Sequence, residues 1–392
     1  MTKYILNILI FTLLVNLSNS QNLDSLYVSK INDTILSKYL NEKRPIEIQL
    51  PRSYDVELDK KYPLIIVLDG DYMFNIAAGS VDYLSYWGDI PENLVVGISQ
   101  KETRFKDSSI FDNLTHTPIT STASFYDFIV NEVIPYFTKN YRISNFRVIL
   151  GHERTANFAN FFLLKKNPVF RGVISISPKI SKNMNTYLSE NLSKTNSNIV
   201  YTLSSSKKDF ESIFKDVIDL QNSLDSVNNK NLKFKSLIFD EENHYILPSI
   251  SVPKSISTLY SMYSDIDKTE YDSIISNLDT SPVDYLLKRY ELIKDFYDED
   301  KTISMNDFMA IEEYIEENEF FDLYNELSQL ANQEYPGTIL PSYYKGRFYE
   351  ETGNPEKAVH IYRSSYNMNE VEGLTKEYLF ELADRIKEDF NY

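Results

Sequence analysis

The chain has 392 residues, no cysteine and a formal net charge of −17 at pH 7. This length suits about two domains of ~150 residues each. Without cysteine the chain has neither a disulfide framework nor thiol chemistry. So negative a charge disfavours nucleic acids and anionic membrane surfaces as partners, and we expect neither.

The first 20 residues have the pattern of an export signal. Lys3 supplies a positive charge, and an apolar stretch follows from Tyr4 to Val15. Ser18 and Ser20 then place small residues at the −3 and −1 positions of a cut before Gln21. The apolar stretch is shorter than the ~20 residues that a membrane span needs, which disfavours the alternative of a membrane anchor. We therefore expect residues 1–20 to be a cleaved signal peptide, leaving no membrane span and a mature protein in the periplasm or outside the cell.

Beyond the signal, residues 22–41 are mixed and are expected to be peripheral, and strand-like segments follow. These are Pro45–Leu50, Leu64–Leu68, Leu94–Ile98, Val148–Leu150, Val173–Ile176, Ile199–Leu203 and Leu232–Phe239. Helical spacing of apolar residues occurs between them, at Phe125–Phe137 and Phe210–Leu224. Strands alternating with helices predict an α/β fold, a mostly parallel sheet with helices on both faces.

In such a sheet the functional loops lie at the carboxyl ends of the strands. Three segments should therefore meet at one rim: Asp69–Phe74, Gly151–Asn157 and the residues after Leu203. His244 follows the last predicted strand and is expected at the same rim.

Several motifs occur in an order and spacing typical of one family. They are Lys61–Gly70, Ile90–Ile98, Phe125–Tyr136, Tyr141-Arg142, Gly151-His152 and Ile176–Pro178. On these motifs residues 46–263 resemble the putative-esterase family of α/β-hydrolases, which includes enterochelin esterase and esterase D-type proteins. The resemblance implies an α/β-hydrolase domain and hydrolysis of carboxylic esters by a Ser-His-acid triad. We expect no cofactor, because the sequence has no Gly-rich phosphate loop.

The sequence departs from this family at the nucleophile. An α/β-hydrolase usually has Gly-x-Ser-x-Gly at a sharp turn from strand to helix. Here Gly151 is kept, but Glu153 stands at the Ser position and Thr155 at the second Gly position. Glu153 has no hydroxyl that a histidine could deprotonate for attack on a carbonyl.

The other site residues follow from the resemblance. His244 corresponds to the catalytic histidine and Asp209 to its acid, although a loop Asp before a helix is as often a helix cap. Asp240 and Glu241 are less favoured alternatives as the acid. The oxyanion hole would use the backbone N–H of Arg154 with that of Asp71 or Tyr72. No metal is expected, because the four histidines are scattered and cysteine is absent.

Three hypotheses for the function remain open. The one we favour is a degenerate hydrolase that keeps a cleft for a small ester-like ligand. In the second, Glu153 is a carboxylate nucleophile and His244 activates water, as in α/β-hydrolases that use an Asp at this turn. In the third, another hydroxyl within Ser204–Ser206 replaces the missing serine.

After Tyr263 the pattern becomes helical, so we expect a hydrolase domain over residues 21–264 and an α-helical domain over 265–392. Amphipathic helices are predicted at Tyr285–Ile293, Phe308–Ile315 and Phe321–Leu330. Five residues then match the spacing of one tetratricopeptide repeat, namely Gly346, Tyr349, Gly353, Ala358 and Tyr362. This domain is either a groove for a protein or peptide partner or a helical cap on the hydrolase domain.

Overall fold

The structure, a computed structural model, describes residues 29–390. The chain divides into two compact units. The N-terminal unit runs to Tyr263 and includes Phe296–Asp298, and the C-terminal unit comprises Ser264–Asp295 and the residues from Glu299 onward. The predicted signal peptide, residues 1–20, lies outside the described residues. Within residues 29–390 no helix has the length and apolar character needed to cross a membrane.

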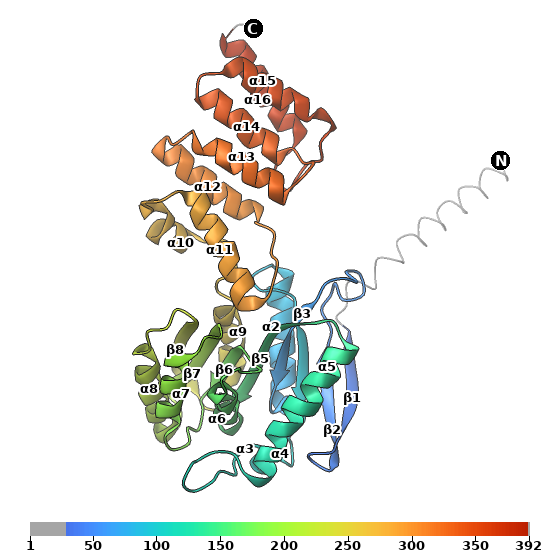
Figure 1. Ribbon diagram of the computed structural model, residues 1–392, viewed down its shortest axis with the longest axis vertical. Coiled ribbons are helices and arrows are strands. Elements are labelled where there is room, and N and C mark those ends of the chain that lie inside the picture. Colours follow the sequence, from blue (N-terminus) through green and yellow to red (C-terminus); the bar gives the residue numbers. More distant parts are fainter. Residues whose placement is uncertain (1–28, 391–392) are drawn as a thin grey trace, which may run out of the picture. The chain divides into compact units, whose positions relative to one another are not determined.

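The N-terminal unit is built on an eight-stranded sheet in the order β1-β2-β4-β3-β5-β6-β7-β8 (Figure 1). Its strands are β1 Lys30–Ser37, β2 Glu42–Gln49, β3 Tyr62–Val67, β4 Leu94–Ile98, β5 Ile143–His152, β6 Gly172–Ile176, β7 Ile199–Lys208 and β8 Leu232–Asn243. β2 pairs antiparallel with β1 and β4, and all other pairs are parallel. The predicted α/β fold with a mostly parallel sheet is confirmed.

Two strands differ from the prediction. β1 lies within residues 22–41, for which no element was predicted. It pairs on one side only and alternates exposed residues with partly or fully buried ones, so it lacks the apolar run of a central strand. β7 continues past Leu203 to Lys208, because Ser204–Ser206 keep their backbone pairing with β8 despite their polar side chains.

Helices lie on both faces of the sheet. They are α2 Gly70–Tyr86, α3 Arg104–Ser108, α4 Thr120–Phe128, α5 Ile134–Asn140, α6 Arg154–Asn160, α7 Met184–Lys194, α8 Glu211–Asp225 and α9 Leu247–Leu259. The helix predicted over Phe125–Phe137 is present but spans α4, a π-helical turn at Ile129–Val133, and α5. In Figure 1, α4, α5 and α6 lie in front of the sheet, and α2 and α9 lie behind it.

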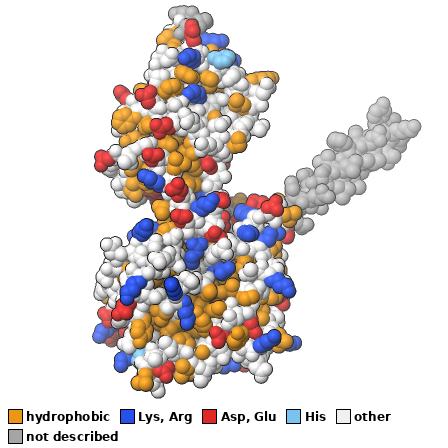
Figure 2. All heavy atoms as spheres, in the orientation of Figure 1, with side chains coloured by type: hydrophobic (Ala, Val, Ile, Leu, Met, Phe, Trp, Pro, Cys, Tyr) orange, Lys and Arg blue, Asp and Glu red, His pale blue; other side chains and the backbone are white. Residues whose placement is uncertain are grey.

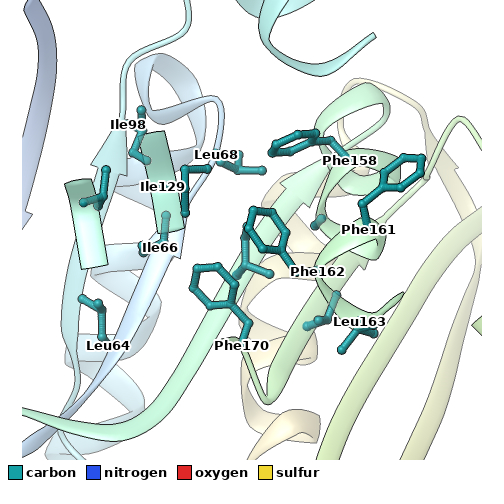
Figure 3. Packing of buried hydrophobic residues seen from close by; sticks show 14 of the residues in the cluster. Leu64, Ile66, Leu68, Ile98, Ile129, Phe158, Phe161, Phe162, Leu163 and Phe170 are labelled. Carbon is teal, nitrogen blue, oxygen red and sulfur yellow. The ribbon is translucent and has the colours of Figure 1, made fainter. Parts of the chain in front are cut away.

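The central strands pack on both faces. Leu64 and Ile66 of β3 face the cluster that contains Phe158 and Phe162, at α6 and just after it (Figure 3). On the opposite face, α2 packs so closely on β4 that a Cβ at Gly97 would lie 2.8 Å from the Phe74 ring. Burial on both sides accounts for the continuous apolar runs of these strands.

The C-terminal unit is helical and has a hydrophobic core of its own. Its helices are α10 Lys268–Ser273, α11 Pro282–Tyr297, α12 Met305–Asn318, α13 Leu323–Glu334, α14 Leu340–Glu351, α15 Pro355–Ser364 and α16 Lys376–Phe390. The last residues of α11 belong to the N-terminal unit. α14 and α15 meet where Gly346 faces the buried ring of Tyr362, and a Cβ at Gly346 would lie 2.0 Å from that ring.

Candidate functional site

Glu153 occupies a sharp turn between β5 and α6. Its backbone has φ 56° and ψ −105°, a strained conformation for a residue with a side chain. Three backbone hydrogen bonds hold the turn: Glu153 N–H donates to Ile176 O at 2.9 Å, and Glu153 O accepts from the N–H groups of Asn157 and Lys179. A Cβ at Gly151 would lie 2.6 Å from the Thr155 carbonyl group, so the turn requires glycine there. This conformation lifts the side chain at position 153 away from the sheet.

The carboxylate of Glu153 forms an ion pair with Arg104, which lies at the start of α3. Arg104 Nη1 is 2.8 Å from Glu153 Oε2, and the Glu153 side chain is 19% exposed. The Arg104 Nε and Nη2 atoms donate to Asp69 at 2.7 and 3.0 Å, and Nη2 also donates to the His152 carbonyl. The guanidinium is therefore fixed at every nitrogen, and it holds Glu153 in place.

Asp69 anchors this network from the turn between β3 and α2. It is buried, and its carboxylate accepts hydrogen bonds from Thr155 Oγ1 at 2.7 Å and Tyr72 Oη at 3.1 Å as well as from Arg104. Burial raises the pKa of Asp69, while the Arg104 charge and these hydrogen bonds act in the opposite direction. Thr155 thus contributes a hydroxyl to the network.

His244 and Asp209 form a hydrogen-bonded pair at the same rim. His244 Nδ1 lies 2.7 Å from Asp209 Oδ1, and Asp209 also accepts from the hydroxyl groups of Ser177 and Ser205. Burial tends to raise the pKa of Asp209, but the hydrogen bonds from His244 and the two serines lower it overall. The Asp209 carboxylate is thereby placed to orient the imidazole of His244.

The two other acids considered for this role lie elsewhere. Asp240 pairs with Lys207 at 2.7 Å, and Glu241 pairs with Lys208. Both carboxylates are exposed, so Asp209 is the acid that the structure brings to His244.

His152 lies next to His244 and stays neutral. The two imidazole rings are 4.7 Å apart, and His152 Nδ1 is 3.0 Å from Tyr72 Oη. Burial, with smaller contributions from the His244 and Arg104 charges, lowers the pKa of His152 to about 3. Within residues 29–390, no hydrogen-bond partner reaches its buried Nε2 atom.

These side chains surround a cavity of about 380 Å³. Its lining consists of Tyr72, Ile76, Arg104, His152, Glu153, His244, Tyr245, Pro248 and Ser249. The structure therefore places Glu153 and His244 at one cavity, with Asp209 behind His244. Among the described residues, no group of three or more His, Asp or Glu side chains could hold a metal ion.

The sequence profile of the family described as Putative esterase matches residues 37–229. This part of the chain is similar to that family, and we call the N-terminal unit the esterase-family domain. No curated protein matches the chain significantly.

Among solved structures, an uncharacterised protein from Capnocytophaga ochracea is 21% identical, with a TM-score of 0.79 over 92% of this chain and 100% of its own. The match therefore extends into the helical C-terminal unit. An IroE-like serine hydrolase from Shewanella oneidensis is 20% identical, with a TM-score of 0.58 over 78% of this chain and 99% of its own. At these identities the comparisons establish the fold.

The backbone groups expected at the oxyanion hole differ in their surroundings. Tyr72 N–H donates to Asp69 O at 3.1 Å, so this group is already engaged. The Asp71 carboxylate accepts from Gln100 N–H at 2.7 Å and lines a different hollow. Arg154 is the first residue of α6, and N–H groups of a first turn have no partner within their helix. Of the expected donors, Arg154 N–H is the one directly beside Glu153.

The serines proposed as substitute nucleophiles do not reach the cavity. Ser204–Ser206 are completely buried in β7. The Ser204 hydroxyl pairs with Ser251 at 2.6 Å, and that of Ser205 donates to Asp209. Their burial excludes them as replacements for the missing serine. The sequence did not point to Arg104, because no motif surrounds it and its contact with Glu153 spans 49 residues.

Proposed function

We propose that the esterase-family domain binds a small ester-like ligand at the Glu153 cavity and does not hydrolyse it by a serine mechanism. The observation that carries this proposal is the ion pair of Glu153 with Arg104 at the nucleophile turn. A serine mechanism needs a hydroxyl whose proton passes to the histidine as the oxygen attacks the carbonyl. Glu153 instead offers a carboxylate that is ion-paired with Arg104, a cation that it shares with Asp69.

The cavity has the features of a binding site. Ile76, Tyr245 and Pro248 provide apolar surface, and His244 provides a hydrogen-bonding group. A mostly apolar cavity with a few fixed polar groups is typical of small-molecule sites. These features support the proposal that the cavity binds a ligand that the altered turn does not cleave.

A cavity-filling variant tests the proposal. Ser249 lines the cavity and is exposed, so Ser249→Trp should occupy the space without unfolding the domain. With a panel of short-chain p-nitrophenyl esters, saturation-transfer NMR should show contact with the wild-type protein and loss of contact in Ser249→Trp. Ser226→Trp, at an exposed serine that does not line the cavity, is the matched control. Equal signals in Ser249→Trp and the wild type would contradict binding at this cavity.

A second candidate is a hydrolase with Glu153 as its nucleophile. The intact His244–Asp209 pair beside the same cavity favours it. Glu153 would attack an alkyl carbon, release the leaving group, and form an ester that water activated by His244 hydrolyses. Turnover in ¹⁸O-labelled water would then place the label in Glu153, and His244→Gln would accumulate the ester. We rank this candidate second, because the Arg104 ion pair makes the Glu153 carboxylate a weaker nucleophile.

We also infer that the mature protein begins at Gln21 and is exported to the periplasm or beyond. The charge, apolar stretch and small residues of positions 1–20 support this inference. Mass spectrometry of the N-terminal peptide from the native host's extracytoplasmic fraction tests it. A peptide that begins at Met1 would contradict it.

A further inference from the structure

The C-terminal unit contains a groove of about 750 Å³, larger than the cavity at Glu153. Its walls come from four helices that are distant in sequence, α10, α12, α14 and α16, and from residues 372–374. Stacked helices of this kind form extended concave surfaces that other chains can occupy. The proposed function of the esterase-family domain makes no use of this groove.

The groove is acidic. Four carboxylates line it, those of Asp267, Glu312, Glu313 and Glu372, against one basic side chain, Lys268. Lys268 is itself paired with Asp272 at 2.9 Å. Glu313 and Glu372 are exposed, so they are accessible to charges on a ligand.

Glu312 lies deeper than the other carboxylates. It accepts hydrogen bonds from Tyr343 Oη at 2.5 Å and Tyr344 Oη at 3.4 Å. Burial raises the pKa of Glu312, and the Tyr343 hydroxyl and the Arg347 charge oppose that effect. The floor of the groove thus combines a carboxylate with tyrosine rings, a combination that suits the cation and the stem of a long basic side chain.

Exposed apolar side chains lie beside the acids. Met309 is 58% exposed and Tyr378 is 44% exposed, although both are large apolar groups. Methionine and tyrosine are enriched at protein interfaces, where methionine adapts to different partners. On the face drawn in Figure 2, acidic and hydrophobic side chains also lie next to one another over the C-terminal helices.

We propose that this groove docks a segment of another protein that is rich in arginine or lysine and carries apolar side chains between them. The cations face Glu313 and Glu372, and the apolar side chains contact Met309 and Tyr378. Charge complementarity selects the segment, and the groove's extension over four helices favours a chain over a small cation.

Fluorescence anisotropy with the full mature chain tests this proposal. The probe is a labelled ten-residue peptide of alternating arginine and leucine, and a peptide of alternating glutamate and leucine is its counterpart. We expect the arginine peptide to bind and the glutamate peptide to show at least tenfold weaker binding. The double variant Glu313→Lys/Glu372→Lys should weaken binding of the arginine peptide at least tenfold.

A matched variant separates the groove from the overall negative charge. Glu388 and Asp389 are exposed acids outside the groove lining, and Glu388→Lys/Asp389→Lys makes the same change in net charge. We expect this control to change binding less than twofold, and Met309→Ala to weaken it with every charge kept. Equal weakening in the two charge variants, no binding of the arginine peptide, or full binding by Met309→Ala would overturn the proposal. None of these outcomes depends on ligand binding or chemistry at Glu153.

Discussion

The guanidinium of Arg104 lies 2.8 Å from the carboxylate of Glu153, at the turn where a serine hydrolase carries its nucleophile. Asp69 holds the same guanidinium from the other side at 2.7 Å. Arg104 and Asp69 therefore hold the Glu153 side chain in a fixed position. This arrangement is the basis of our view that the domain retains a binding site and lacks the serine mechanism.

Removal of Arg104 should destabilise the domain. Arg104→Ala leaves Asp69 buried without its cation, and breaking such a pair costs several kcal/mol when both partners are buried. Because the Arg104 side chain is 27% exposed, we expect a smaller loss. The loss should be roughly 2–4 kcal/mol of unfolding free energy, measured by urea denaturation at pH 7.

Arg154→Ala is the control for that experiment. Arg154 has a similar exposure, but its nearest carboxylate contact is 3.7 Å, so we expect a loss of less than about 1 kcal/mol. Equal losses in the two variants would show that the Arg104 network has no special role in stability.

A hydroxyl restored at the turn should restore chemistry. In Glu153→Ser the strained backbone conformation presents a serine to the cavity that His244 lines, with Asp209 behind the histidine. We expect hydrolysis of p-nitrophenyl acetate at least about tenfold faster than in the wild type, because the nucleophile and its base act as a unit. Glu153→Gln, which supplies no hydroxyl, and Glu153→Ser/His244→Ala should both remain at the wild-type level. A rate in Glu153→Ser that does not depend on His244 would show that the turn does not bring residue 153 to this histidine.

The neutral His152 should make stability depend on pH. Its pKa is about 3 in the folded protein, against 6.5 for an ordinary histidine. Between these values the unfolded chain binds more protons, so stability falls as pH falls below 6.5. At pH 5 the loss should be about 2 kcal/mol relative to pH 7. His152→Asn should remove this part of the slope in urea denaturation series from pH 7 to 5, whereas parallel slopes would contradict the assignment.

Gly346 should tolerate no side chain. A Cβ there would lie 2.0 Å from the buried Tyr362 ring, so Gly346→Ala should cost about 1–3 kcal/mol of unfolding free energy. Gly79, in α2, has no atom within 4 Å of its hypothetical Cβ, and Gly79→Ala should gain up to about 1 kcal/mol. Urea denaturation followed by circular dichroism checks both. A neutral Gly346→Ala would mean that α14 and α15 can separate at no cost.

The central strands could be predicted from the sequence because burial on both faces gives them apolar runs. β3 and β4, in which every residue is buried, are examples. Edge strand β1 was not predicted, because its exposed residues interrupt the apolar pattern of a strand. The extension of β7 was not predicted either, because the polar residues Ser204–Ser206 are typical of a loop, whereas pairing with β8 holds them in the sheet.

The candidate site was predicted unevenly for a similar reason. Glu153 and His244 stand in local motifs that the family resemblance could locate. Arg104 has no such motif, and its role depends on contacts with Asp69 and Glu153, which are 35 and 49 residues away in the chain. Contacts between residues so far apart in the chain form only in the completed fold, and no local sequence pattern predicts them.

The most direct test is hydrolysis of a short-chain p-nitrophenyl ester panel by the wild-type mature protein beside His244→Ala. Both proteins must show the same folded circular dichroism spectrum. We expect the two rates to be equal and close to the uncatalysed rate for every ester. Faster hydrolysis by the wild type, lost in His244→Ala, would show that the site is a working esterase and would contradict a site that binds esters without cleaving them.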